Sequence, residues 1–226
     1  MDQKIPFTSY DFWAYLSAGF LLLFAIDSVV GTKLLMRNSW TIVQGVVAIS
    51  VAYAVGQLIA SASATVFEKV LVGKLFGYPR DTLFGKSRAS KKVQRLLPGY
   101  FMTLPAATQA AVLEKGQKQG VGQSGEALFW VAFSYARQTP AVMSRLETFL
   151  NLYGFCRNTA LVAFIDAALF YWSYLQSNGP SEHLLWSRLS LIVAIGMTLR
   201  YLKFFRLYAN EVFTSFAYAK EPEKKP

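Results

Sequence analysis

The chain has 226 residues, of which 54% are hydrophobic and 16% are charged, and its formal net charge is +10. This composition is too apolar for an ordinary soluble domain and predicts an integral membrane protein. A single Cys156 excludes an internal disulfide, and a single His183 argues against a histidine-rich metal site, so we expect no metal and no cofactor.

Two apolar stretches near the start of the chain predict a first membrane hairpin. They cover residues 12–30 and 41–64, and each is long enough to cross about 30 Å of hydrocarbon. The first stretch lacks the basic flank and the small-residue cleavage site of a signal peptide, so we expect it to be retained as a span. Trp40 in the turn between the stretches is typical of an interfacial anchor.

Two further apolar stretches predict a second hairpin over residues 157–176 and 184–204, joined by a turn that contains Gly179 and Pro180. The last span is the weakest of the four. Arg188 and Arg200 leave eleven charge-free residues between them, which is about 16 Å of helix. We therefore expect this span to pack among other helices.

Between the hairpins lies a basic insert. Residues 66–157 carry thirteen basic and five acidic side chains, and the positive-inside rule places this insert and both chain termini in the cytoplasm. Pro105, Ser124 and Pro140 each indicate the start of a helix within the insert.

The sequence thus predicts an all-α, polytopic membrane protein with four transmembrane helices in two hairpins. The expected domains are hairpin 1 (1–65), the helical cytoplasmic insert (66–156), and hairpin 2 with a cytoplasmic C-terminal extension (157–226).

The densest positive cluster of the chain lies in the insert and contains no acid. Its members are Lys86, Arg88, Lys91, Lys92 and Arg95. Such a cluster either attracts anionic lipid headgroups, at about 1 kcal/mol per basic residue, or binds the phosphates of a nucleotide or oligonucleotide, or meets an acidic protein. In the second case Tyr100, Phe101 or Trp130 can stack on bases.

Small residues recur every four positions along the second span and share one helical face. This ladder consists of Ala48, Ala52, Gly56, Ala60 and Ala64. Small residues let helix backbones approach closely in lipid. The pattern predicts a tight helix contact, either within one subunit or between subunits.

Polar residues recur every seven positions on the third span, at Thr159, Asp166 and Ser173. They are predicted either to line a water-filled path for cations or to be buried polar groups. In the second case Arg188 is the expected ion-pair partner of Asp166 or of Asp27. For Asp27 we expect such a structural pair, with Arg188 or with Lys33.

Catalysis finds little support, because one His and one Cys cannot form the usual nucleophile and base arrangements. A secondary transporter is disfavoured as well, since no pair of Gly/Pro-broken spans is present. We therefore expect a non-enzyme with no catalytic residues, either a pore-forming or signalling membrane oligomer or a membrane adaptor.

Three segments carry a resemblance to a family of small bacterial four-span proteins: "YDFWAYLSAGFLLLF", "AYAVGQLIA" and "FLNLYGFCRN". The layout is similar to that of the transmembrane effectors of Hailong-type phage-defence systems. This resemblance implies a homo-oligomeric, tetrameric ion channel in the bacterial inner membrane. Its cytoplasmic region would bind a single-stranded DNA oligomer made by a partner nucleotidyltransferase, and loss of the ligand would depolarise the cell. A non-conducting, Kiwa-like sensor or adaptor is the alternative.

Overall fold

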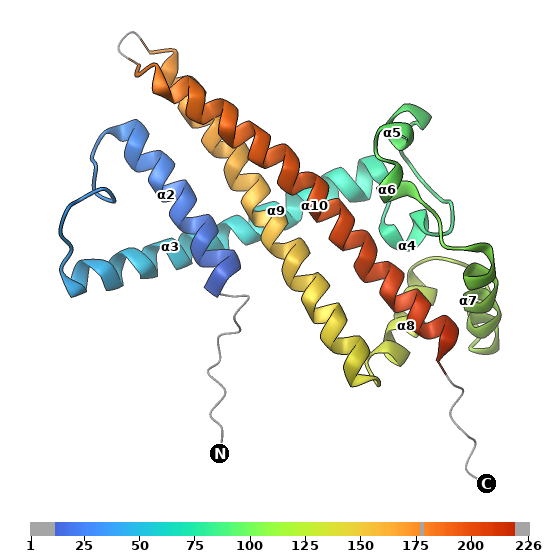
Figure 1. The fold of residues 1–226 in the computed structure, drawn as a ribbon. Coiled ribbons are helices and arrows are strands. Elements are labelled where there is room, and N and C mark those ends of the chain that lie inside the picture. The colour runs from blue at the N-terminus through green and yellow to red at the C-terminus, as the bar shows by residue number, and fades with distance from the viewer. Residues whose placement is uncertain (1–11, 177–178, 220–226) are drawn as a thin grey trace, which may run out of the picture. The chain divides into compact units, whose positions relative to one another are not determined.

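A computed structural model describes residues 12–176 and 179–219, with side chains from residue 14 onward. Every regular element in these residues is a helix (Figure 1). In chain order the helices are η1 (Phe12–Leu16), α2 (Ser17–Val30), α3 (Ile42–Ser63), η2 (Ala64–Phe76), α4 (Pro79–Thr82), α5 (Lys91–Leu96), α6 (Pro98–Phe101), α7 (Ala106–Lys118), α8 (Glu126–Ala136), α9 (Pro140–Tyr174) and α10 (Glu182–Tyr218).

The prediction of an all-helical chain is confirmed, and all four predicted apolar stretches are helical. Two helical stretches are long and apolar enough to cross a membrane: Ile42–Thr82 and α10. The stretch Ala14–Val30 is apolar but shorter. The third predicted span, 157–176, covers the C-terminal part of α9 and the two residues after it, and α9 is not among these apolar stretches.

The chain forms two compact units. The first unit comprises the described residues of Met1–Glu68 and Tyr153–Tyr201, and the second those of Lys69–Leu152 and Leu202–Pro226. The second unit thus includes the C-terminal part of α10 together with most of the insert, whereas the sequence grouped the C-terminal extension with hairpin 2. Both chain termini, predicted to be cytoplasmic, lie outside the described residues.

In the first unit, α2 crosses α3 with almost no space between the backbones. A Cβ atom on Gly56 of α3 would lie 1.9 Å from the carbonyl oxygen of Tyr15, and one on Gly19 would lie 1.8 Å from that of Ala52. Glycine at both positions therefore permits the crossing. Val162 of α9 completes the packing against α2 and α3.

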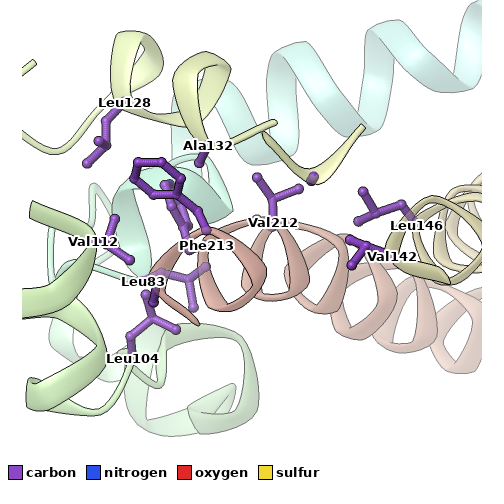
Figure 2. Close-up of a cluster of buried hydrophobic side chains, with 13 residues drawn as sticks. Leu83, Leu104, Val112, Leu128, Ala132, Val142, Leu146, Val212 and Phe213 are labelled. Carbon is purple, nitrogen blue, oxygen red and sulfur yellow. The ribbon is translucent and has the colours of Figure 1, made fainter. Parts of the chain in front are cut away.

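The second unit has a hydrophobic core of its own, shown in Figure 2. Val212 and Phe213 of α10 are fully buried at its centre. The core residues around them come from the loop after α4, from the segment before α7, and from α7, α8 and the first turns of α9: Leu83, Leu104, Val112, Leu128, Ala132, Val142 and Leu146. α7 begins at Ala106, directly after Pro105, and α9 begins at Pro140 as predicted. α8 begins after Gly125 and not after Ser124, because Gly125 adopts a φ of 151° there.

Candidate functional site

The exposed cations of the basic cluster lie on the short helix α5. Ser90 caps this helix, because its Oγ accepts a hydrogen bond from the backbone N–H of Val93 at 3.5 Å. Lys91, Lys92 and Arg95 are all exposed, and none of them makes a hydrogen bond or ion pair with another described residue. These three side chains, the α5 cations, are free to meet an external anion.

The other two members of the basic cluster have internal partners. Lys86 Nζ donates to the carbonyl oxygen of Ser124 at 3.3 Å. The guanidinium of Arg88 donates to the carbonyl oxygen of Gly73 in η2. Both cations thus use hydrogen-bond donors on neutral carbonyl groups, and these groups do not compensate their positive charges. The cluster predicted from sequence therefore divides into three exposed cations and two that fasten the loop.

Two buried side chains anchor the α5–α6 segment, residues 86–102, within the second unit. Tyr100 donates its hydroxyl to the carbonyl oxygen of Gly77 at 2.8 Å, just beyond the end of η2. Arg206 of α10 donates from Nε (3.2 Å) and from a terminal nitrogen (2.8 Å) to the carbonyl oxygen of Met102. The α5–α6 segment is thus bonded both to the end of η2 and to α10.

Burial sets the protonation of these anchors. Burial, and secondarily the charge of Asp81, raises the pKa of Tyr100 well above its usual range, so the phenol keeps the proton that it donates. Burial also lowers the pKa of Arg206 from its ordinary value, but arginine starts so high that the side chain stays charged near neutrality. Sequence reasoning missed Arg206, because Met102 lies 104 positions earlier in the chain.

Only one of the three aromatic residues proposed to stack on bases is available. Tyr100 is buried, and Phe101 packs against Phe76 with 5.8 Å between ring centroids. Trp130 of α8 is 55% exposed. Glu126, one turn earlier on α8, accepts a hydrogen bond from Arg80 at 2.9 Å, which places Trp130 near a basic side chain of α4.

Asp27 does not form the ion pair expected with Arg188 or Lys33. Its carboxylate accepts hydrogen bonds from the Thr32 hydroxyl and from the backbone N–H groups of Leu34 (2.9 Å) and Leu35 (3.0 Å). Gly31, with φ of 77°, turns the chain back over the end of α2 and brings these donors to the carboxylate. A local loop, and not a distant cation, therefore satisfies this acid.

Arg188 is exposed on α10, and it pairs with neither Asp27 nor Asp166 in the described part of the chain. The prediction that Arg188 forms an ion pair with Asp27 or with Asp166 is therefore wrong for both acids in the described residues.

The first unit contains a buried polar network that the sequence analysis did not identify. Arg157 of α9 pairs with Glu68 of η2 and donates to Ser63 Oγ at 3.0 Å. Ser63 in turn donates to Asn158 Oδ1 at 2.7 Å. The side chains of Arg157 and Glu68 are 12% and 30% exposed. This network fixes α9 against the junction of α3 and η2.

The predicted polar face of the third span is covered by its own protomer. Thr159, Asp166 and Ser173 are all buried, and Asp166 is 7% exposed. Ser173 Oγ and His183 Nδ1 lie 2.9 Å apart, which closes the top of the α9–α10 hairpin. Among the described residues, Thr159 Oγ1 and Asp166 Oδ1 have no hydrogen-bond partner. Within a single copy of the chain, these three residues are therefore buried polar groups and do not line a water-filled path.

The ladder of small residues packs within one copy over its central part. Ala52, Gly56 and Ala60 are buried, whereas Ala48 and Ala64 are half-buried. Ala52 and Gly56 contact η1 and α2, and the carbonyl oxygen of Ala60 accepts a hydrogen bond from Arg157 at 3.4 Å. The intrasubunit alternative therefore holds for this face.

No group that could hold a metal ion forms among the His, Cys, Asp and Glu side chains of the described residues. In comparisons with protein-family models, with curated proteins and with solved structures, the chain matches none of them.

Proposed function

We propose that this chain is a four-span protein of the bacterial inner membrane that assembles into an ion-conducting homo-oligomer under the control of an anionic ligand. The ligand is a nucleotide or a single-stranded oligonucleotide made by a partner enzyme, and it binds the α5 cations in the cytoplasm. The setting in phage defence rests on the resemblance of the membrane segments alone.

One observation carries this proposal: the α5–α6 segment is bonded to both long apolar helical stretches. Tyr100 and Arg88 hold it to the end of η2, which continues α3, and Arg206 holds it to α10. A ligand that shifts this segment would act on both helices at once. Because a ligand biases an equilibrium only through different affinities for two states, the segment must lie differently in the open and closed forms.

The membrane location is supported by where the apolar side chains lie. Only 17% of the most apolar window is buried in Ile42–Thr82, and the same share is buried in α10. The core helix of a soluble protein would be mostly buried. Large exposed side chains on α3 include Val43, Val47 and Leu58. So much apolar surface requires lipid or other helices around it.

Binding is tested with the purified full-length protein and a labelled short oligodeoxyadenylate. We expect Lys91→Glu, Lys92→Glu and Arg95→Glu in combination to weaken binding. The slope of log affinity against log salt should fall by about two, since each phosphate contact contributes roughly 0.7 for a single strand. The matched control reverses three other exposed charges of the second unit, Lys74, Lys118 and Arg137. Equal binding by the α5 variant and by the wild type would exclude the α5 cations as the site.

Conduction is tested in liposomes that contain the same protein. We expect potassium efflux in the absence of the oligonucleotide and a decrease when it is added. The α5 variant should conduct but should not respond to the ligand. Liposomes that stay tight with ligand-free protein would exclude the channel.

A non-conducting sensor or adaptor is the second candidate, and exposed Trp130 favours it. An exposed tryptophan beside packed aromatic rings, here Phe129 at 5.7 Å and Phe133 at 5.9 Å between ring centroids, is typical of a protein-binding hot spot. The adaptor requires a cytoplasmic partner whose binding Trp130→Ala abolishes, together with no ion efflux. The channel requires efflux that Trp130→Ala does not remove.

A further inference from the structure

The side of α3 that faces away from the rest of the first unit has a regular pattern of its own. The residues of this face follow one another at spacings of four, three, four, three and four: Val43, Val47, Ser50, Ala54, Gln57 and Ser61. All six are exposed. Alternating spacings of three and four are those of a heptad seam, along which two helices pack with a left-handed crossing.

This seam lies opposite the buried face of α3. At 100° per residue, Ala54 is about 160° around the helix from buried Gly56. Ile49 and Ala62 are also exposed, but they lie on opposite sides of the seam, about 140° and 80° around the helix from Ala54, and carry only hydrocarbon. The outward half of α3 therefore has a polar strip with small residues, and apolar positions lie on either side of it.

Lipid is a poor neighbour for the polar strip. Ser50 satisfies its hydroxyl within the helix, by donating to the carbonyl oxygen of Val46 at 2.9 Å. Gln57 donates one hydrogen bond from Nε2 to the hydroxyl of Tyr53 at 3.0 Å, which uses one of its two amide hydrogens. The second amide hydrogen and the carbonyl oxygen of Gln57 have no partner in the described chain. Each unsatisfied group of this kind is costly in hydrocarbon.

We propose that this seam is the contact between copies of the chain in the membrane, with α3 packed against α3 of a neighbouring copy. A carboxamide is both donor and acceptor, so Gln57 of a symmetry-related copy satisfies both of its open groups. Ala54 and Ser61 let the two backbones approach. The inference rests on the proposed function in one respect, the location of α3 in the bilayer.

The test is cysteine cross-linking of the full-length protein in native membranes, on a Cys156→Ala background. Single cysteines replace Ser50, Ala54, Gln57 or Ser61 on the seam, and Ile49 or Ala62 away from the seam as matched controls. All six positions are exposed, so the fold should tolerate each variant. We expect oxidation to give cross-linked dimers at the seam positions and several-fold less at the controls. Equal cross-linking at the seam and control positions, or none on the seam, would overturn the inference.

A second measurement removes the amide itself. Gln57→Leu should weaken self-association in detergent by about threefold to tenfold, the value of one hydrogen bond between membrane helices, whereas Ile49→Ala should not. An unchanged dissociation constant of the oligomer for Gln57→Leu would also count against the seam. Seam cross-links without ion efflux would leave the interface standing and remove the channel. Efflux without seam cross-links would do the reverse.

Discussion

Arg157 on α9 pairs with Glu68 on η2, and both side chains are largely withdrawn from solvent. Their partners within the first unit, Ser63 and Asn158, are fully buried. A charge held in this way is stable only while its counter-charge is present, because removing one partner leaves the other desolvated and unpaired.

The first prediction therefore concerns Glu68. We expect Glu68→Gln to destabilise the protein by about 1–3 kcal/mol, because the Arg157 charge loses its compensation. Thermal unfolding of the detergent-solubilised protein measures the effect. The pair of Arg145 with Glu211 provides the control, since Arg145 is 55% exposed, and Glu211→Gln should cost about 0–1 kcal/mol. Equal losses of stability for the two variants would show that the Arg157–Glu68 pair contributes no more than the exposed pair.

The second prediction concerns the crossing of the first two helices. Gly56→Ala places a methyl group where a Cβ lies 1.9 Å from the Tyr15 carbonyl oxygen, so the helices must separate. We expect a loss of about 1–3 kcal/mol, as for other overpacked sites. A Cβ on Gly45 of the same helix meets no atom within 4 Å, so Gly45→Ala should stabilise α3 by up to about 1 kcal/mol. Unfolding midpoints that shift in the same direction for both variants would contradict the close crossing.

Hydrophobic periodicity and length account for most of what the sequence revealed about the fold. The predicted segment 12–30 coincides with η1 and α2, because an uninterrupted apolar run has few alternatives to a helix. Pro140 marked the start of α9 for a similarly local reason, since proline suits the first helical turn. Rules of this kind depend only on residues that are close together in the chain, so the helices that they predicted agree with those of the structure.

The partners of polar side chains were harder to predict. Charge alone suggested a structural ion pair between Asp27 and a distant arginine, but the partners of Asp27 come from a loop that turns back at Gly31. The bond from Arg206 to Met102 spans 104 positions and leaves no periodic signal. The division of the basic cluster into free and bonded members likewise depends on which carbonyl groups the fold brings near.

The third prediction concerns Asp166, whose Oδ1 is buried without a hydrogen-bond partner in the described residues. An isolated carboxylate in an apolar helix pair is costly, and a neutral side chain of the same shape removes the cost of burying a charge. We expect Asp166→Asn to raise the stability by about 1–3 kcal/mol, as measured by thermal unfolding in detergent.

Ser173→Ala is the matched variant on the same face of α9. It removes the contact with His183, and we expect it to lower the stability by about 1 kcal/mol. If Asp166→Asn instead left the stability unchanged and altered ion selectivity in liposomes, Asp166 would have to face a water-filled path.

The fourth prediction concerns the link between the α5–α6 segment and α10. Arg206→Ala removes a buried side chain and both of its donors to the Met102 carbonyl oxygen. Hydrogen bonds from a charged group are worth about 1.5–3 kcal/mol, so we expect the free energy of unfolding of the second unit to fall by about that amount. Because the α5 cations are unaltered, oligonucleotide binding should persist near its wild-type affinity, while its effect on ion efflux should decrease. Arg206→Lys keeps one charged donor and should restore part of the coupling. Full ligand control in the Arg206→Ala protein would show that the signal does not pass through α10, and that the end of η2, held by Tyr100, carries it alone.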